Sequence, residues 1–133
     1  MNAQKKKIGI QLPRQANPEE LAIRYSLELE ALDPVAEIIE VAAKTPEEFA
    51  AGVKHMDAII TSWGFRIDAN LIEQLEKCVV IGVGSVGVDM VDIEAATRAG
   101  IVVTNVPDVF IEEVADHALM LFLGCSRHIK AMN

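Results

Sequence analysis

Five short apolar runs, each separated from the next by a segment with a helical pattern, constrain the fold of this chain most strongly. The runs are KIGIQL (7–12), VAEIIEVAA (35–43), DAIITS (57–62), CVVIGV (78–83) and IVVTNV (101–106). Strict alternation of strands and helices is typical of a parallel sheet covered by helices on both faces. The sequence therefore predicts an α/β fold with a doubly wound parallel sheet of five strands in the flavodoxin-like order.

The segments between these runs begin with residues that favour helix starts. NPEE (17–20) and TPEE (45–48) each place a capping side chain before a proline at the first helical position, followed by glutamates suited to a capping box. Asp68 and Asp92 occupy similar capping positions before further helical patterns. Gly100 precedes the last run, where a left-handed helix end is expected. Helices are therefore predicted between the strands.

Three loops are expected to lie together at one edge of the sheet. The carboxyl ends of parallel strands meet at the same edge, and the ligands of doubly wound folds bind beyond it. The loops that follow the predicted strands there are 12–17, 62–66 and 82–89. Residues that recognise a ligand are therefore expected in these loops.

The charge of the chain limits its partners. With 12 Lys and Arg against 20 Asp and Glu, the formal net charge is −8, and the basic residues form no stripe beyond Lys5–Lys7. Nucleic acid is therefore not an expected partner. In so negative a field, a small anionic ligand needs strong local donors, such as convergent backbone N–H groups or an arginine supplied by another domain.

Length and hydropathy indicate one globular domain without a membrane span. The chain has 133 residues, a size that suits a single core, and no apolar run reaches the roughly 18 residues that a span requires. The basic start leads directly into the first strand without a signal-peptide core, so a cytoplasmic location is expected. Cys78 and Cys125 lack the spacing of metal ligands, so no metal site is expected and both are predicted to be reduced core thiols.

The C-terminal segment, DVFIEEVADHALMLFLGCSRHIKAMN (108–133), is apolar on almost every side. Val114 and Leu121 belong to one helical stripe, and Leu119 and Leu123 widen it. A helix of this kind needs cover, so it is expected to mediate self-association. No glycine cap, proline or returning strand follows this helix. We therefore expect the natural polypeptide to continue beyond this segment.

The stretch CVVIGVGSVGVD (78–89) places Gly82, Gly84 and Gly87 in G-x-G-x-x-G spacing after an apolar strand. In dinucleotide-binding loops with this spacing, the helix begins within the motif and its N-terminus faces a pyrophosphate. Here VDMVD separates the motif from the next helical pattern. The residues alone leave three functions open: a dinucleotide loop, a tight strand-to-helix turn, or a binding loop for another ligand.

Residues 82–123 contain an ordered series of longer motifs. They are S-V-G-x-D at 85–89, D-x-x-A-A-x-x-x-G at 92–100, N-V-P at 105–107 and E-x-V-A-D-H at 112–117. With these motifs in this order and spacing, the segment strongly resembles the D-isomer-specific 2-hydroxyacid dehydrogenases. Residues 1–77 match that family only in their β-α layout.

The resemblance implies that the glycine loop binds substrate and is not the nucleotide fingerprint. The backbone N–H groups of Val86 and Gly87 would hold the carboxylate of a 2-oxo or 2-hydroxy acid, and Ser85 would lie at the same site. Ser62 and Trp63 would shape the pocket around the C3 substituent of the substrate. Because glycine lets a ligand approach the backbone closely, this role is also physically reasonable.

The resemblance also implies a division of the chain. Residues 1–107 would form the substrate-binding, flavodoxin-like domain. Residues 108–133 would form an inter-domain and dimerisation helix at the start of a truncated, nucleotide-binding Rossmann domain. Val86 and Val114 would contact the cofactor, NAD or NADP, and the protein would be a homodimer.

The implied activity is that of an oxidoreductase, which transfers a hydride between NAD(P)H and C2 of a small 2-oxoacid or D-2-hydroxy acid. In that family the catalytic arginine, glutamate and histidine lie in the later domain. No catalytic residue is therefore assigned here, and the chain alone is expected to be inactive. His117 belongs to the E-x-V-A-D-H motif, and a structural, hinge-facing role is expected for it. The alternative is a stand-alone nucleotide-binding or regulatory flavodoxin-like module.

Two departures from the family pattern bear on the substrate. Phosphoglycerate-type members place an arginine in the loop after the third strand, where this chain has Ser62, although Arg66 could substitute from a different angle. Formate dehydrogenases in the wider family carry an asparagine where this chain has Phe110. Neither a phosphorylated substrate nor formate is therefore expected.

Overall fold

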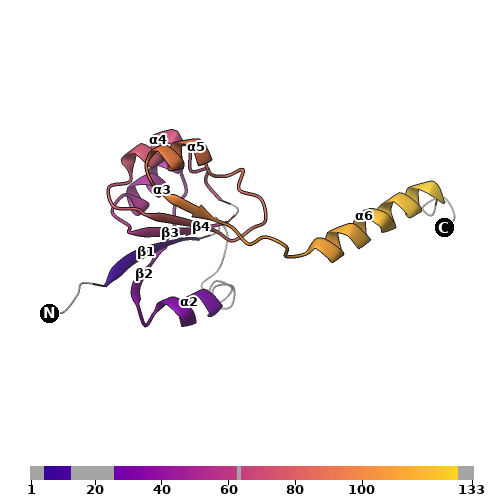
Figure 1. The fold of residues 1–133 in the computed structure, drawn as a ribbon, viewed down its shortest axis with the longest axis horizontal. Coiled ribbons are helices and arrows are strands. Elements are labelled where there is room, and N and C mark those ends of the chain that lie inside the picture. The colour runs from indigo at the N-terminus through magenta and orange to yellow at the C-terminus, as the bar shows by residue number, and fades with distance from the viewer. Residues whose placement is uncertain (1–4, 13–25, 63, 129–133) are drawn as a thin grey trace.

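The computed structural model describes residues 5–12, 26–62 and 64–128, and its centre is one sheet of five parallel strands (Figure 1). The strands are β1 (Lys6–Gln11), β2 (Ala36–Val41), β3 (Ala58–Thr61), β4 (Val80–Val83) and β5 (Val102–Thr104). Their order is β2-β1-β3-β4-β5, and every neighbouring pair is parallel. This order is the flavodoxin-like one, so the predicted fold class is confirmed.

Helices cover both faces of the sheet. The helices of the described ranges are α2 (Ser26–Leu32), α3 (Pro46–Val53), α4 (Ala69–Gln74), α5 (Ile93–Arg98) and α6 (Ile111–Ser126). Figure 1 shows α3, α4 and α5 together on one face and α2 on the other. The larger core lies under α3 to α5 and includes Phe49, Ile59 and Ile81, none of which exposes any surface. On the α2 side, Leu29 packs against the buried Ile10.

The predicted caps hold the ends of the covering helices. Thr45 accepts a hydrogen bond from the N–H of Glu48 at 3.2 Å. Asp68 accepts one from Leu71, and Asp92 accepts one from Ala95, each at 2.9 Å. Satisfying these N–H groups stabilises the first turn of each helix. These three starts are confirmed, whereas NPEE (17–20) lies outside the described residues.

Gly100 also has the predicted conformation. Its φ is +72°, in the left-handed region that ends a helix without strain when the residue is glycine. The chain therefore turns from α5 into β5 where the sequence indicates.

Helix α6 differs from α3, α4 and α5 because none of its residues is buried. In Figure 1 it extends away from the sheet and its covering helices. Cys125 on α6 is exposed, so the prediction that it is a core thiol is wrong for this chain. The physical reason is that no other element of the described chain packs against this apolar helix. Cys78 is buried as predicted, and burial raises the pKa of its thiol. No helix of the described ranges has the length and apolar character needed to span a membrane.

Candidate functional site

The loop that follows β4, residues 84–89, is called the glycine loop. It lies at the edge of the sheet where all five strands end. The N–H of Gly84 donates to the carbonyl oxygen of Thr61, the last residue of β3, at 2.8 Å. A Cβ added to Gly84 would lie 3.9 Å from the Cβ of Ser62. The loops after β3 and β4 are therefore neighbours at this edge, as the predicted topology requires.

The glycine loop is held by hydrogen bonds to its carbonyl groups. The hydroxyl of Ser85 donates to the carbonyl of Gly87 at 2.8 Å, and the side-chain amide of Asn105 donates to the carbonyl of Val86 at 2.7 Å. The N–H of Val106 donates to the carbonyl of Ser85 at 3.2 Å. Three successive carbonyls are thus engaged, and the backbone of the loop is fixed before any ligand arrives.

The N–H groups of Val86 and Gly87 are free polar groups of this loop. Within the described part of the chain, neither donates a hydrogen bond to another residue. Two adjacent backbone donors on a fixed loop can bind one carboxylate or a similar small anion. The site needs no side-chain charge to do so, which matters in a chain with a net charge of −8.

None of the three motif glycines has a backbone conformation that only glycine adopts readily. Among the described glycines, Gly100 alone has a positive φ. A Cβ on Gly82 or Gly84 would make only ordinary contacts of 3.6 Å or more, and a Cβ on Gly87 would lie 3.0 Å from Oδ2 of Asp89. The geometry therefore does not favour the tight-turn interpretation. The absence of side chains instead leaves the backbone of the loop open to close approach.

The helix after the loop is poorly suited to bind a pyrophosphate. Helix α5 begins at Ile93, six positions after Gly87, and has only six residues. The carboxylate of Asp92 already accepts the N–H of Ala95 in its first turn. A dinucleotide loop needs that helix N-terminus free and next to the glycines. The geometry therefore disfavours the dinucleotide interpretation of G-x-G-x-x-G.

A cavity of about 290 Å³ lies against the glycine loop. Its lining combines the loop with the connection from β5 to α6, and consists of Gly84, Ser85, Val86, Gly87, Val106, Val109 and Phe110. The side chain of Val86 is half exposed. None of these lining residues is charged, so the cavity offers an anion backbone donors and apolar side chains.

The predicted site residues are brought together only in part. Ser85, Val86 and Gly87 line the cavity. Ser62 is half-buried beside Gly84 but does not line the cavity. Trp63 lies outside the described residues. Val114 is exposed in the first turn of α6 and does not line the cavity.

Four residues of the site were not among the site residues predicted from the sequence. Asn105 holds the loop through Val86, while Val106, Val109 and Phe110 complete the cavity wall. Asn105 and Val106 belong to the N-V-P motif, which drew attention to these positions but did not predict the hydrogen bond from Asn105 to Val86. Phe110 has a φ of +64°, a conformation that the sequence pattern did not indicate for a phenylalanine.

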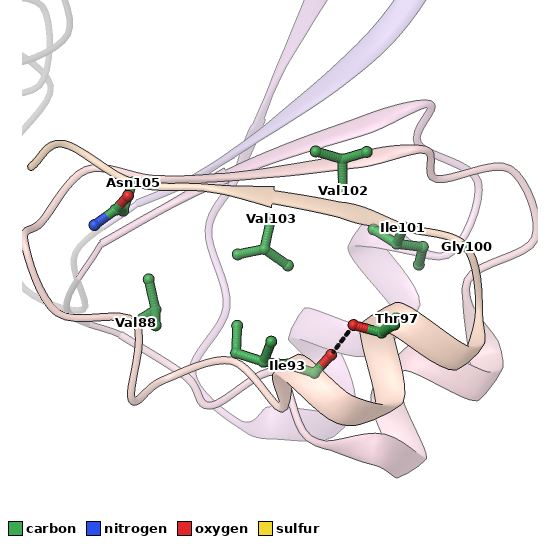
Figure 2. A pocket seen from close by; sticks show the side chains of 8 residues that line it. All are labelled: Val88, Ile93, Thr97, Gly100, Ile101, Val102, Val103 and Asn105. Atoms are coloured by element: carbon green, nitrogen blue, oxygen red, sulfur yellow. Dashed lines mark hydrogen bonds between the residues drawn. The ribbon is translucent and has the colours of Figure 1, made fainter.

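A larger, open groove of about 600 Å³ lies next to the site (Figure 2). Figure 2 shows Val102 and Val103 on β5 and Ile93 and Thr97 on α5, with Asn105 beyond the strand. Thr97 donates to the carbonyl of Ile93 at 2.8 Å and is thereby occupied within its own helix. Asn105 lines this groove and also holds the glycine loop. Asn105 therefore connects this groove to the glycine loop.

Known proteins resemble the chain in sequence and in fold. A family model for the catalytic domain of D-isomer specific 2-hydroxyacid dehydrogenase matches residues 20–127. The D-3-phosphoglycerate dehydrogenase of Methanocaldococcus jannaschii is 37% identical over 101 residues, which are 76% of this chain and 19% of that protein. The glyoxylate reductase of Pyrococcus furiosus is 41% identical over 83 residues, which are 62% of this chain and 25% of that protein.

A solved structure agrees with the topology. The NAD-dependent formate dehydrogenase of Staphylococcus aureus, in complex with NAD, superimposes with a TM-score of 0.78 at 24% identity, covering 94% of this chain and 40% of that chain. At this identity the likeness supports the fold alone.

The chain forms a doubly wound α/β domain, with the glycine loop as a candidate binding loop at the carboxyl edge of its sheet. The family match covers most of the described sheet and helices. The chain belongs to the D-isomer specific 2-hydroxyacid dehydrogenase family, in its catalytic domain. It spans 19% and 25% of the length of the two curated relatives named above.

Proposed function

We propose that this chain is the substrate-binding part of an oxidoreductase that transfers a hydride between NAD(P)H and a small 2-oxoacid or D-2-hydroxy acid. The observation that carries this proposal is the pair of free N–H groups at Val86 and Gly87, on a loop fixed through its carbonyls. Family membership and the glyoxylate reductase of Pyrococcus furiosus support the chemistry of the substrate.

The two N–H groups would each donate to one oxygen of the substrate carboxylate. Hydrogen bonds to a charged acceptor are stronger than neutral ones, and a preorganised loop loses little entropy when it forms them. The apolar, half-exposed side chain of Val86 would exclude water from the neighbouring carbonyl carbon. The nicotinamide cofactor would supply or accept the hydride at that carbon.

The groups that move the proton would come from outside the described residues. Among the described residues, no histidine, arginine, lysine or carboxylate lines the cavity beside the loop. The relatives are several times longer than this chain. We therefore assign substrate binding to residues 1–107 and an inter-domain helix to 108–133, and the chain alone would not turn over substrate.

The residues around the loop favour a small, unphosphorylated acid. Ser62 stands beside Gly84 without bringing a positive charge to the glycine loop. Phe110 contributes an apolar wall to the cavity. An acid with a short C3 substituent fits this lining better than a phosphorylated one, because a phosphate needs charged donors.

Helix α6 would mediate a homodimer. Leu119, Leu121 and Phe122 are each more than half exposed on a single helix. A contiguous apolar surface of this kind marks an interface, and a second copy of the same chain is the simplest partner in a symmetric oligomer.

The substitution Gly87→Ala tests the substrate proposal in the complete enzyme. The added Cβ would stand on the path of the carboxylate and press on Asp89, so KM for glyoxylate should rise about ten- to a hundredfold. NADH binding, followed by fluorescence, should change far less. Gly82→Ala is the matched control, because its Cβ meets only ordinary contacts and Gly82 does not line the cavity. A collapse of NADH binding with unchanged KM would restore the dinucleotide interpretation.

A further inference from the structure

Two buried polar side chains lie directly beneath the candidate site. Gln11 ends β1 and Thr61 ends β3, and in the described ranges they are the only polar residues classed as buried. The hydroxyl of Thr61 donates a hydrogen bond to the side-chain carbonyl of Gln11. Polar groups are buried at a cost unless they are hydrogen-bonded, so a buried pair at this edge calls for an explanation beyond packing.

Thr61 also contacts the glycine loop through its backbone. Its carbonyl oxygen accepts the N–H of Gly84 at 2.8 Å, while its side chain is bonded to Gln11. One residue therefore joins the end of β1 to the first residue of the proposed carboxylate-binding loop.

Gln11 in turn supports the loop that follows β3. A Cβ built on Gly64 would lie 2.3 Å from Nε2 of Gln11 and 2.5 Å from its Cδ, so the backbone of Gly64 rests on the amide group. Farther along the loop, Phe65 is buried and stacks on Phe49, with ring centroids 5.7 Å apart. Within this loop, Gly64 is thus held by Gln11, and Phe65 is held by its stacking on Phe49.

We propose that Gln11 and Thr61 are positioning residues, which set the relative placement of the 62–66 loop and the glycine loop. Neither residue lines the cavity, so each acts through Gly64 or Gly84. A hydrogen bond has a preferred direction, and it fixes the amide plane of Gln11 in a way that apolar contact would not. The link to carboxylate binding rests on the function proposed above, whereas the placement of the loops does not.

The first test needs no ligand. Thr61→Val keeps the shape and β-branching of the side chain but removes the hydroxyl. Amide hydrogen exchange at Gly84, whose N–H donates to the carbonyl of Thr61, should accelerate about tenfold, the effect of losing about one hydrogen bond. Exchange at Ile59 and Ile81, inside the strands, should be unchanged. Thr61→Ser keeps the hydroxyl and should restore slow exchange. Thr104→Val is the matched control, because it makes the same change at the exposed end of β5 and should leave exchange at Gly84 unchanged.

A second variant protects the test against simple misfolding. Gln11→Met removes the amide and keeps a similar length, so it should reproduce the loop exchange of Thr61→Val. The double variant should be no worse than either single one, because both remove the same interaction. Unchanged exchange in folded Thr61→Val, or fully additive effects in the double variant, would overturn the positioning role.

A final readout connects the pair to the substrate. In the complete enzyme, Thr61→Val should raise KM for glyoxylate about tenfold, leave NADH affinity unchanged and be rescued by Thr61→Ser. Accelerated exchange together with an unchanged KM would support the positioning of the loops and overturn its link to substrate. Unchanged exchange and unchanged KM would overturn the positioning role while leaving the proposed function intact.

Discussion

The sheet and helix α6 are both rich in apolar residues, but only the sheet buries them within the described chain. Ile59 and Ile81 in the sheet expose no surface, whereas Phe122 on α6 exposes 67% of its own. The difference teaches that an apolar pattern predicts an element without supplying the partner that covers it. The candidate site lies at the junction of the two regions, where Val106, Val109 and Phe110 connect β5 to α6.

The largest expected contrast comes from making one substitution in both regions. Phe49→Ala removes a fully buried ring that stacks on Phe65, so unfolding should become easier by about 3–5 kcal/mol. Phe122→Ala removes an exposed ring, so under conditions where the chain is monomeric its effect should stay within about 0.5 kcal/mol. Urea denaturation followed by circular dichroism measures both.

The same pair of variants sharpens the proposed role of α6. If Phe122 lies in an interface between copies, Phe122→Ala should weaken self-association about fivefold or more in sedimentation. A chain that stays monomeric at high concentration, or a Phe122→Ala variant as unstable as Phe49→Ala, would break the comparison.

Two glycines give the next contrast. At Gly64 an added methyl would collide with the side chain of Gln11, so Gly64→Ala should destabilise the fold by about 1–3 kcal/mol. At Gly124 on α6 nothing lies within 4 Å of an added Cβ, so Gly124→Ala should increase helix stability by up to about 1 kcal/mol. Thermal denaturation and helical circular dichroism distinguish the two. Equal effects at both positions would contradict the described packing of the 62–66 loop.

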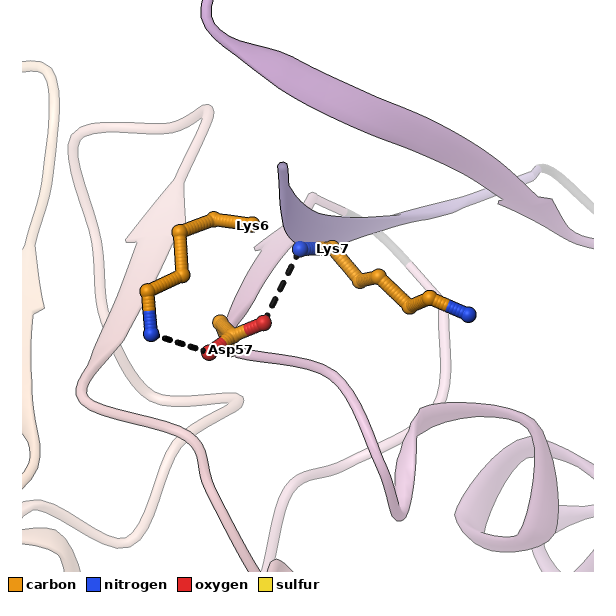
Figure 3. Close-up of polar contacts among 3 residues, drawn as sticks. All are labelled: Lys6, Lys7 and Asp57. Carbon is orange, nitrogen blue, oxygen red and sulfur yellow. Dashed lines mark hydrogen bonds and ion pairs between the residues drawn. The ribbon is translucent and has the colours of Figure 1, made fainter. Parts of the chain in front are cut away.

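The smallest expected effect is electrostatic and lies at the opposite edge of the sheet (Figure 3). The side chain of Lys6 and the backbone N–H of Lys7 both donate to Asp57, at 2.8 Å and 2.9 Å, and these bonds lower the pKa of its carboxyl. The stabilisation is therefore present above the unfolded aspartate pKa of about 3.9 and is lost as pH falls through the lower folded value.

Asp57→Asn should accordingly be less stable than the natural chain at neutral pH, and the difference should vanish in acid. Denaturation midpoints measured between neutral pH and about pH 2 follow this convergence. Asp116→Asn removes the same charge from the exposed helix α6 and serves as the control. A stability difference that grows as the pH falls would contradict the assigned hydrogen bonds.

Local sequence patterns predicted the fold well because its determinants are local. The alternation of apolar runs and the caps at Thr45, Asp68 and Asp92 depend on residues at most four positions apart. These signals were enough for the five strands and for the parallel, flavodoxin-like order. The left-handed Gly100 follows from the same kind of local rule.

The support of the candidate site could not be predicted in this way. Gln11 and Thr61 are 50 positions apart, and Asn105 reaches back 19 positions to Val86, so only the folded sheet brings them together. The glycine motif indicated a binding loop but not its ligand. The structure disfavours two interpretations of the motif. The motif glycines have ordinary φ values, which argues against a tight turn, and Asp92 caps the start of the next helix, which argues against a dinucleotide loop.

The most direct test of the central idea is a titration of the ¹⁵N-labelled chain with glyoxylate and, separately, with NADH. If Val86 and Gly87 hold the substrate carboxylate, their amide resonances should shift on adding glyoxylate, with an affinity of about millimolar or weaker. Glycolaldehyde, which lacks the carboxylate, should leave them in place, and NADH should have little effect. Shifts of these two amides with NADH and none with glyoxylate would contradict the account.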